Sequence, residues 1–267
     1  MNSTQPARLR VVHRSRIVDV WAAGEGPPVV LFHGWGLSGR AYGPVLRALA
    51  GRGYRAIAPS LAVIDPPWTL AGLAEVAADL IGAVDAAPAT ILGHSFGGAL
   101  AIRVAADFPD LASKLVLVNA LGVSPGRRAL VRTVVPGRHW RIGLQRSTAA
   151  ALIGTVARGG GWGSLSGAAR WVLSNSLEEE MERLRERRVH SAVLWGVGDT
   201  LLPKWIGERA AELLGGSFEA VSGEDGWPER RPPDHDWPLR GPEFFAGLVA
   251  GTIDGTRSAR PTPKRAG

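Results

Sequence analysis

The chain has 267 residues, of which 45% are hydrophobic and 21% are charged. This size and composition allow a large buried core, so the fold needs neither disulfides nor a structural metal. The absence of cysteine excludes disulfide bonds, thiolate metal sites and a cysteine nucleophile, and it fits a reducing compartment. The N-terminal segment is basic without an apolar run, and no stretch approaches the roughly 20 apolar residues of a spanning helix. We therefore expect a cytoplasmic protein with no secretory signal and no transmembrane segment.

The net charge of +7 is unevenly distributed along the chain. Residues 111–177 contain no Asp or Glu, but they contain Lys114 and eight arginines, which are Arg127, Arg128, Arg132, Arg138, Arg141, Arg146, Arg158 and Arg170. Such a segment favours anionic ligands or an acidic membrane surface. Nucleic acid is not expected as a partner, because no recognition motif accompanies the charge. The alternative is a basic surface that is simply solvated.

Strand-like and helix-like segments alternate in the first half of the chain. Short apolar or alternating runs predict strands at residues 16–21, 28–32, 54–59, 89–93 and 114–120. Apolar residues at three- and four-residue intervals predict helices within residues 44–53, 70–84 and 98–108. This alternation predicts an α/β fold, in which a mostly parallel sheet is covered by helices on both faces.

The alternation lapses between residues 121 and 188, where helix-like pieces are broken by Gly and Pro. The last piece has a predicted capping box, with Ser176 as the N-cap and Glu179 three residues later. Its first turn is acidic and its last turn is basic, which complements the helix dipole. We interpret this stretch as an inserted helical unit. Alternation then returns, with strands predicted at 191–195 and 218–221 and helices at 205–214 and 242–250.

The motif Gly93-His94-Ser95-Phe96-Gly97 lies between a predicted strand and a predicted helix. A serine at such a turn is held in a strained backbone conformation, and the flanking glycines avoid collisions with the neighbouring strand and helix. The turn exposes the hydroxyl at a helix N-terminus, where developing negative charge is favoured. The alternative is a serine in a tight turn, because the motif alone can arise by chance in a chain with 35 glycines.

A second glycine-containing turn, His33-Gly34-Trp35-Gly36, follows the predicted strand at 28–32. Glycines at this place let a backbone N–H approach a substrate oxygen. The N–H groups of Trp35 and Phe96 are the candidates for an oxyanion hole. The alternative is an ordinary turn between a strand and a helix.

Two later loops supply an acid and a histidine. Asp199 follows the buried strand at 191–195, and His235 lies in a Pro-rich loop before the last helix. Taken alone, Asp199 also fits a helix cap or a turn, and His235 also fits an exposed loop. The order of Ser95, Asp199 and His235 along the chain is that of the α/β-hydrolase nucleophile, acid and base.

With these motifs, residues 16–250 strongly resemble the α/β-hydrolase superfamily, in detail its small serine esterase and carboxylesterase-like branch. The resemblance implies a doubly wound sheet with a helical cap between the sixth and seventh strands. The core would comprise residues 1–121 and 190–251, the cap residues 122–189, and a disordered tail residues 252–267. The resemblance also implies a substrate pocket, and its candidate contacts are His33, Gly34, Gly36, His94 and Trp140. Most tryptophans of the cap are better explained as its own core.

The activity that the resemblance implies is hydrolysis of a carboxylic ester, with no cofactor and no metal. Ser95 would attack the carbonyl, His235 would transfer the proton, and Asp199 would orient the imidazole. The substrate would be a small ester or acyl compound, and the arginines favour an anionic one. Three alternatives stay open: hydrolysis of carbon–carbon bonds in ring-cleavage diketones, acyl transfer to an alcohol or thiol, and a ligand receptor or partner-binding module on the same fold.

Overall fold

The computed structural model describes residues 4–14, 16–61, 69–124, 176–223 and 226–256. Its centre is an eight-stranded sheet with the strand order β1-β2-β4-β3-β5-β6-β7-β8. The strands are β1 (Ala7–His13), β2 (Arg16–Ala23), β3 (Pro28–Phe32), β4 (Arg55–Pro59), β5 (Ala89–His94), β6 (Ala112–Val118), β7 (His190–Gly196) and β8 (Ser217–Val221). Strand β2 pairs antiparallel with both β1 and β4, and all other pairs are parallel. The carboxyl ends of β3 to β8 therefore share one edge of the sheet.

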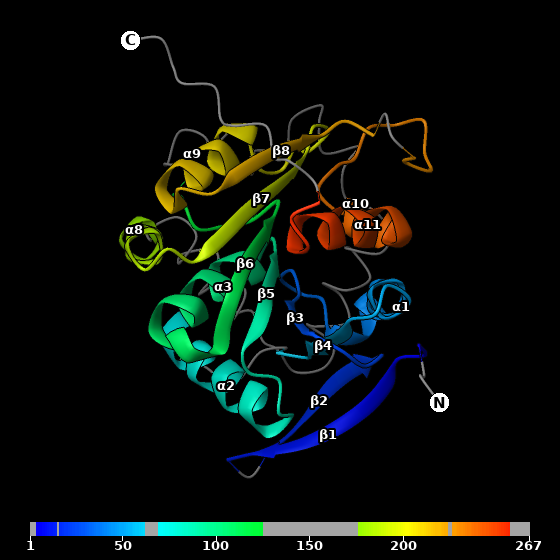
Figure 1. Ribbon diagram of the computed structural model, residues 1–267, viewed down its shortest axis with the longest axis vertical. Helices are drawn as coiled ribbons and strands as arrows, with labels where there is room; N and C mark the ends of the chain where they lie inside the picture. The colour runs from blue at the N-terminus through cyan, green and yellow to red at the C-terminus, as the bar shows by residue number, and fades with distance from the viewer. Residues whose placement is uncertain (1–3, 15, 62–68, 125–175, 224–225, 257–267) are drawn as a thin grey trace.

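Helices cover both faces of this sheet (Figure 1). One face carries α2 (Leu70–Ala83), α3 (Phe96–Asp107), α8 (Glu178–Glu186) and α9 (Lys204–Leu214). The other face carries α1 (Gly43–Ala50), α10 (Trp237–Arg240) and α11 (Pro242–Ile253). Short 3-10 turns span Gly39–Tyr42 and Pro109–Leu111. The α/β fold predicted from the alternating pattern is confirmed.

The central strands are apolar on both sides, because each side packs against a helical layer. Along β5, Ile91 belongs to the core under α2 and α3, whereas Leu92 belongs to the core under α1 and α11. Helix α8 contacts α3 and α9, and its Met181 and Leu184 are fully buried in the same core as Ile91. The C-terminal part of the predicted insertion thus lies in the helical layer over the sheet. Residues 125–175 lie outside the described residues, so the cap remains a prediction.

The last helix closes onto the first one. Helix α11 contacts α1, and Arg52, just after α1, donates to the carboxylate of Glu243 at 2.7 Å. The hydroxyl of Tyr54 donates to the carboxylate of Asp254 at 2.6 Å. Helix α11 ends at Ile253, three residues beyond the predicted end, so the first two residues of the predicted tail are helical. Within the described residues, no helix is long and apolar enough to cross a membrane.

Two local predictions were wrong. The first predicted strand was the one at residues 16–21, but the sheet begins earlier, with β1 at Ala7–His13. Strand β1 is mostly exposed, so it lacks the clear alternation by which a half-buried strand is recognised. The capping box is also absent: Leu177 is the N-cap of α8, and the hydroxyl of Ser176 bonds to the carboxylate of Glu178. The buried side chain of Leu177 and its N–H, which donates to Gly122 O, fix this end of the helix instead.

Candidate active site

Ser95 occupies a strained turn between β5 and α3. Its backbone angles are φ 55° and ψ −121°, in a region that non-glycine residues rarely adopt. A Cβ at Gly93 would lie 2.4 Å from Gly97 O, and a Cβ at Gly97 would lie 2.1 Å from Phe32 O at the end of β3. The prediction that the glycines avoid collisions with a helix and a strand is therefore confirmed.

The structure brings Ser95, His235 and Asp199 together at the carboxyl edge of the sheet. His235 Nε2 lies 2.9 Å from Ser95 Oγ, and His235 Nδ1 lies 2.8 Å from Asp199 Oδ2. Because a carboxylate only accepts, Nδ1 carries the proton and Nε2 accepts from the serine hydroxyl. Three segments that are far apart in the sequence thus form one continuous hydrogen-bonded chain.

The acid and the histidine stabilise each other's charged forms. Burial alone would raise the pKa of Asp199, but the charge and the hydrogen bond of His235 oppose this effect, and the pKa is lowered. Burial alone would lower the pKa of His235, but the charge and the hydrogen bond of Asp199 outweigh it, and the pKa is raised. The pair therefore suits a histidine that receives a proton next to a carboxylate that remains ionised.

Asp199 is held by groups that sequence reasoning did not assign. Its Oδ1 accepts from the N–H groups of Leu201 and Leu202 at 2.8 and 2.9 Å, and its Oδ2 accepts from the side-chain amide of Asn119. The carbonyl oxygen of Asn119 in turn accepts from Gly196 N–H at 3.0 Å and from the indole of Trp237 at 2.9 Å. The position of Asn119 directly after β6, next to the strand that precedes Asp199, was the available signal.

The turn after β3 lies directly against the serine. A Cβ at Gly34 would lie 3.3 Å from His94 Nδ1 and 3.4 Å from Ser95 Cβ. Gly36 has φ 74°, a conformation that favours glycine. Trp35 and Phe96, the predicted oxyanion donors, are half-buried at this turn and at the start of α3. Both glycine-containing turns thus meet beside Ser95.

His33 is engaged with the protein backbone. Its Nε2 accepts from Leu61 N–H at 3.1 Å, and its Nδ1 lies 2.9 Å from Gly34 O, to which it must donate. Burial lowers the pKa of His33, which keeps the ring neutral. These bonds occupy both ring nitrogens, so neither is available to the substrate contact that was predicted. Trp140, another predicted contact, lies outside the described residues.

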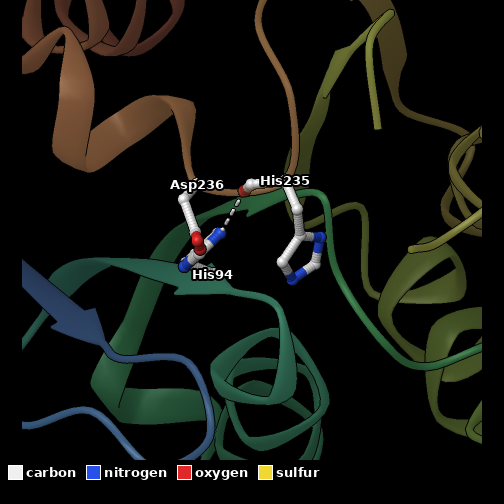
Figure 2. Close-up of side chains that lie close together, drawn as sticks. All are labelled: His94, His235 and Asp236. Carbon is white, nitrogen blue, oxygen red and sulfur yellow. Dashed lines mark hydrogen bonds between the residues drawn. The ribbon is translucent and has the colours of Figure 1, made fainter. Parts of the chain in front are cut away.

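His94 is also occupied within the protein, and Figure 2 shows it with His235 and Asp236. Among the described residues, these three have potential metal-ligand atoms that lie within 4.8 Å of one another. However, His94 Nε2 lies 2.8 Å from the backbone oxygen of His235, and His94 Nδ1 lies 2.6 Å from the hydroxyl of Tyr42. Since the ring nitrogens of His235 bind Ser95 and Asp199, neither imidazole has a free lone pair for a metal.

An eight-stranded sheet with a strained serine turn after β5, an acid after β7 and a histidine after β8 defines the α/β class of hydrolases. A family model described as "Alpha/beta hydrolase family" matches residues 29–254, and the chain belongs to this family.

Individual relatives carry several activities. The chain is 26% identical to a putative non-heme haloperoxidase of Mycobacterium phage D29, over 87% of this chain and 90% of the relative. It is 38% identical to a pimeloyl-acyl-carrier-protein methyl ester esterase of Chromobacterium violaceum, over 36% of this chain and 37% of the relative. A solved structure of a bacterial membrane phospholipase A aligns with TM-score 0.73 at 20% identity, over 96% of this chain and 88% of that one. The matches to the first mycobacterial relatives, which are uncharacterized, span 31% of their length.

Proposed function

We propose that the protein hydrolyses a carboxylic ester through an acyl-enzyme intermediate. The observation that carries this proposal is the hydrogen-bonded chain of Ser95, His235 and Asp199. Ser95 Oγ attacks the ester carbonyl while His235 Nε2 takes its proton and then passes it to the leaving alcohol. A water molecule repeats the sequence on the acyl-enzyme and releases the acid. Asp199 stabilises the imidazolium that forms in both steps.

The negative charge of the tetrahedral intermediate requires donors beside Ser95. The backbone N–H groups of Trp35 and Phe96 are proposed for this role. Their support is the close approach of the Gly34 turn to the serine and the position of Phe96 as the first residue of α3, where the helix dipole favours an anion. Gly34 and Gly36 would then contact the substrate next to its ester carbonyl.

A panel of chromogenic esters that vary in acyl length and charge, together with a ring-cleavage diketone, tests the reaction and its substrate class. We expect turnover of esters and none of the diketone. If the arginines between residues 127 and 170 attract the substrate, salt should raise KM more for an anionic ester than for its neutral analogue. Equal responses to salt would identify these arginines as surface charge. Turnover of the diketone alone would favour a carbon–carbon bond hydrolase.

The pH dependence of kcat/KM provides a second test. His235 must be neutral to accept the serine proton, so activity falls as the pH drops through its pKa. Because Asp199 raises this pKa above the ordinary histidine value of 6.5, we expect the acid limb of the profile above pH 6.5. Initial rates measured at constant ionic strength between about pH 5 and 9 would give its position. An acid limb well below 6.5 would contradict the pairing of His235 with Asp199.

A further inference from the structure

A buried chain of hydrogen bonds links the three loops of the candidate site behind the serine. Gly34 N–H, in the turn after β3, donates to the hydroxyl of Tyr42 at 3.2 Å. This hydroxyl lies 2.6 Å from His94 Nδ1, and His94 Nε2 lies 2.8 Å from His235 O. His94 is the last residue of β5 and directly precedes Ser95. The chain therefore runs from the turn of the predicted oxyanion hole, past the nucleophile, to the backbone of the histidine loop.

The direction of each bond follows from chemistry. A carbonyl oxygen only accepts, so His94 Nε2 carries the proton and donates to His235 O. His94 Nδ1 then has a lone pair, and the hydroxyl of Tyr42 donates to it while accepting from Gly34 N–H. Tyr42 is fully buried and His94 is 1% exposed, so water does not compete for these bonds. The polar groups of Gly34, Tyr42, His94 and His235 in this hydrogen-bonded series all have partners only while His94 is neutral and in this tautomer.

We propose that Tyr42 and His94 are positioning residues, which hold the Gly34 turn and the His235 loop in fixed relation to Ser95. This inference rests on the proposed function and assigns a role to two residues that do not themselves touch the reacting atoms. The anchor on the backbone of His235 fixes the origin of its side chain, whose two nitrogens must reach two different loops. The anchor on Gly34 fixes the turn that faces the ester carbonyl.

Histidine suits this position for two physical reasons. Its ring presents an acceptor and a donor in opposite directions, at distances that one rigid side chain can span. Its neutral form also avoids charge repulsion, because its ring centroid lies 5.3 Å from that of His235, which becomes cationic during the reaction. Burial, followed by the nearby charge of His235, lowers the pKa of His94 to about 4. A lysine or arginine at this place would oppose the imidazolium.

The pKa of His235, measured by NMR titration of the histidine rings, tests the proposal without any substrate. In His94→Asn the shorter side chain still reaches Tyr42 but not His235 O, whereas in His94→Gln the amide nitrogen lies about where Nε2 was. We expect His94→Asn to lower the pKa of His235 by about one, because the ring loses its fixed contact with Asp199. His94→Gln should restore most of the wild-type value. His13→Asn, on β1 beside Asp79, is the matched control and should leave this pKa unchanged.

Ester turnover gives the second readout. His94→Asn should lower kcat about 10- to 100-fold with little change in KM, and His94→Gln should recover it.

An unchanged pKa of His235 in folded His94→Asn would overturn the proposal. If His94→Asn does not fold, Tyr42→Phe decides: it removes one oxygen, and we expect the amide proton of Gly34 to exchange at least about ten times faster. An unchanged exchange rate would overturn the proposal. If His94→Asn lowers the pKa of His235 but the wild-type enzyme hydrolyses no ester, the positioning role is supported and the proposed function is refuted.

Discussion

We expect the replacement of Ser95 with alanine to lower ester turnover by about four to six orders of magnitude while the fold is retained. In the proposed mechanism the hydroxyl oxygen of Ser95 attacks the carbonyl. Among the described residues, the ring nitrogens of His235 bond only to Ser95 and Asp199, so this variant lacks the proposed nucleophile. The change removes one oxygen at a position whose backbone strain is already accommodated by Gly93 and Gly97. Initial rates with a neutral short-chain ester, together with loss of labelling by a fluorophosphonate probe, measure the effect.

The matched control is Ser191→Ala. Ser191 is a serine too, but it is buried at the start of β7 and its hydroxyl donates to Val189 O at 3.0 Å. We expect this variant to retain nearly the wild-type rate. Equal ester turnover by the wild type and Ser95→Ala would show that the activity does not depend on this serine, and the proposed mechanism would have to be abandoned.

Replacing Asp199 with asparagine lowers kcat by about three to four orders of magnitude. The asparagine amide would donate to His235 Nδ1, so Nε2 would carry the proton and could not take one from Ser95. Asn119, the polar neighbour of Asp199, is itself an amide and supplies no charge for the imidazolium. The N–H groups of Leu201 and Leu202 can still bond to the amide oxygen, so the loop should keep its conformation. Initial rates of the purified variant measure the loss of turnover, and its thermal melting shows whether the fold is retained.

Asp236→Asn is the control for this variant, since it removes the carboxylate of the residue that follows His235, whereas the two ring nitrogens of His235 bond to Asp199 and Ser95. We expect it to lose less than about tenfold in kcat. If Asp199→Asn stays nearly as active as the wild type, the acid has been assigned to the wrong residue. The pH profile of Asp199→Asn should also lose its acid limb above pH 6.5, because the charge that raises the pKa of His235 is gone.

The sequence predicts well what local patterns encode. The strand, turn and helix around Ser95 follow from an apolar run, two glycines and a helical repeat, which all lie within about 20 residues. Asp199 and His235 were found because each follows a recognisable strand in the expected order. These signals are sufficient for the fold and for the residues of the hydrogen-bonded chain.

The supporting contacts could not be predicted in the same way. Tyr42 and His94 are separated by 52 residues, and Asn119 and Trp237 by 118, so no local pattern relates them. His94 was predicted to contact substrate, but its two ring nitrogens bond to Tyr42 and to the backbone of His235, which come from distant parts of the sequence. The capping box of Ser176 failed for a related reason, since the burial of Leu177 set the helix end. Tertiary packing overrode local preference at each of these places.

The closure of α11 onto α1 makes the order of folding matter for activity. A chain that emerges from the ribosome presents β3, β5 and the serine turn long before the acid and the histidine have been synthesised. The loop of His235 leads into α10, and both α10 and α11 contact α1, with Arg52 bonded to Glu243 and Tyr54 to Asp254. A nascent chain that ends before residue 235 therefore contains the proposed nucleophile, Ser95, and lacks the proposed base, His235. Under the proposed mechanism, activity therefore depends on residues that are synthesised late, in the part of the chain whose last helix packs against the first.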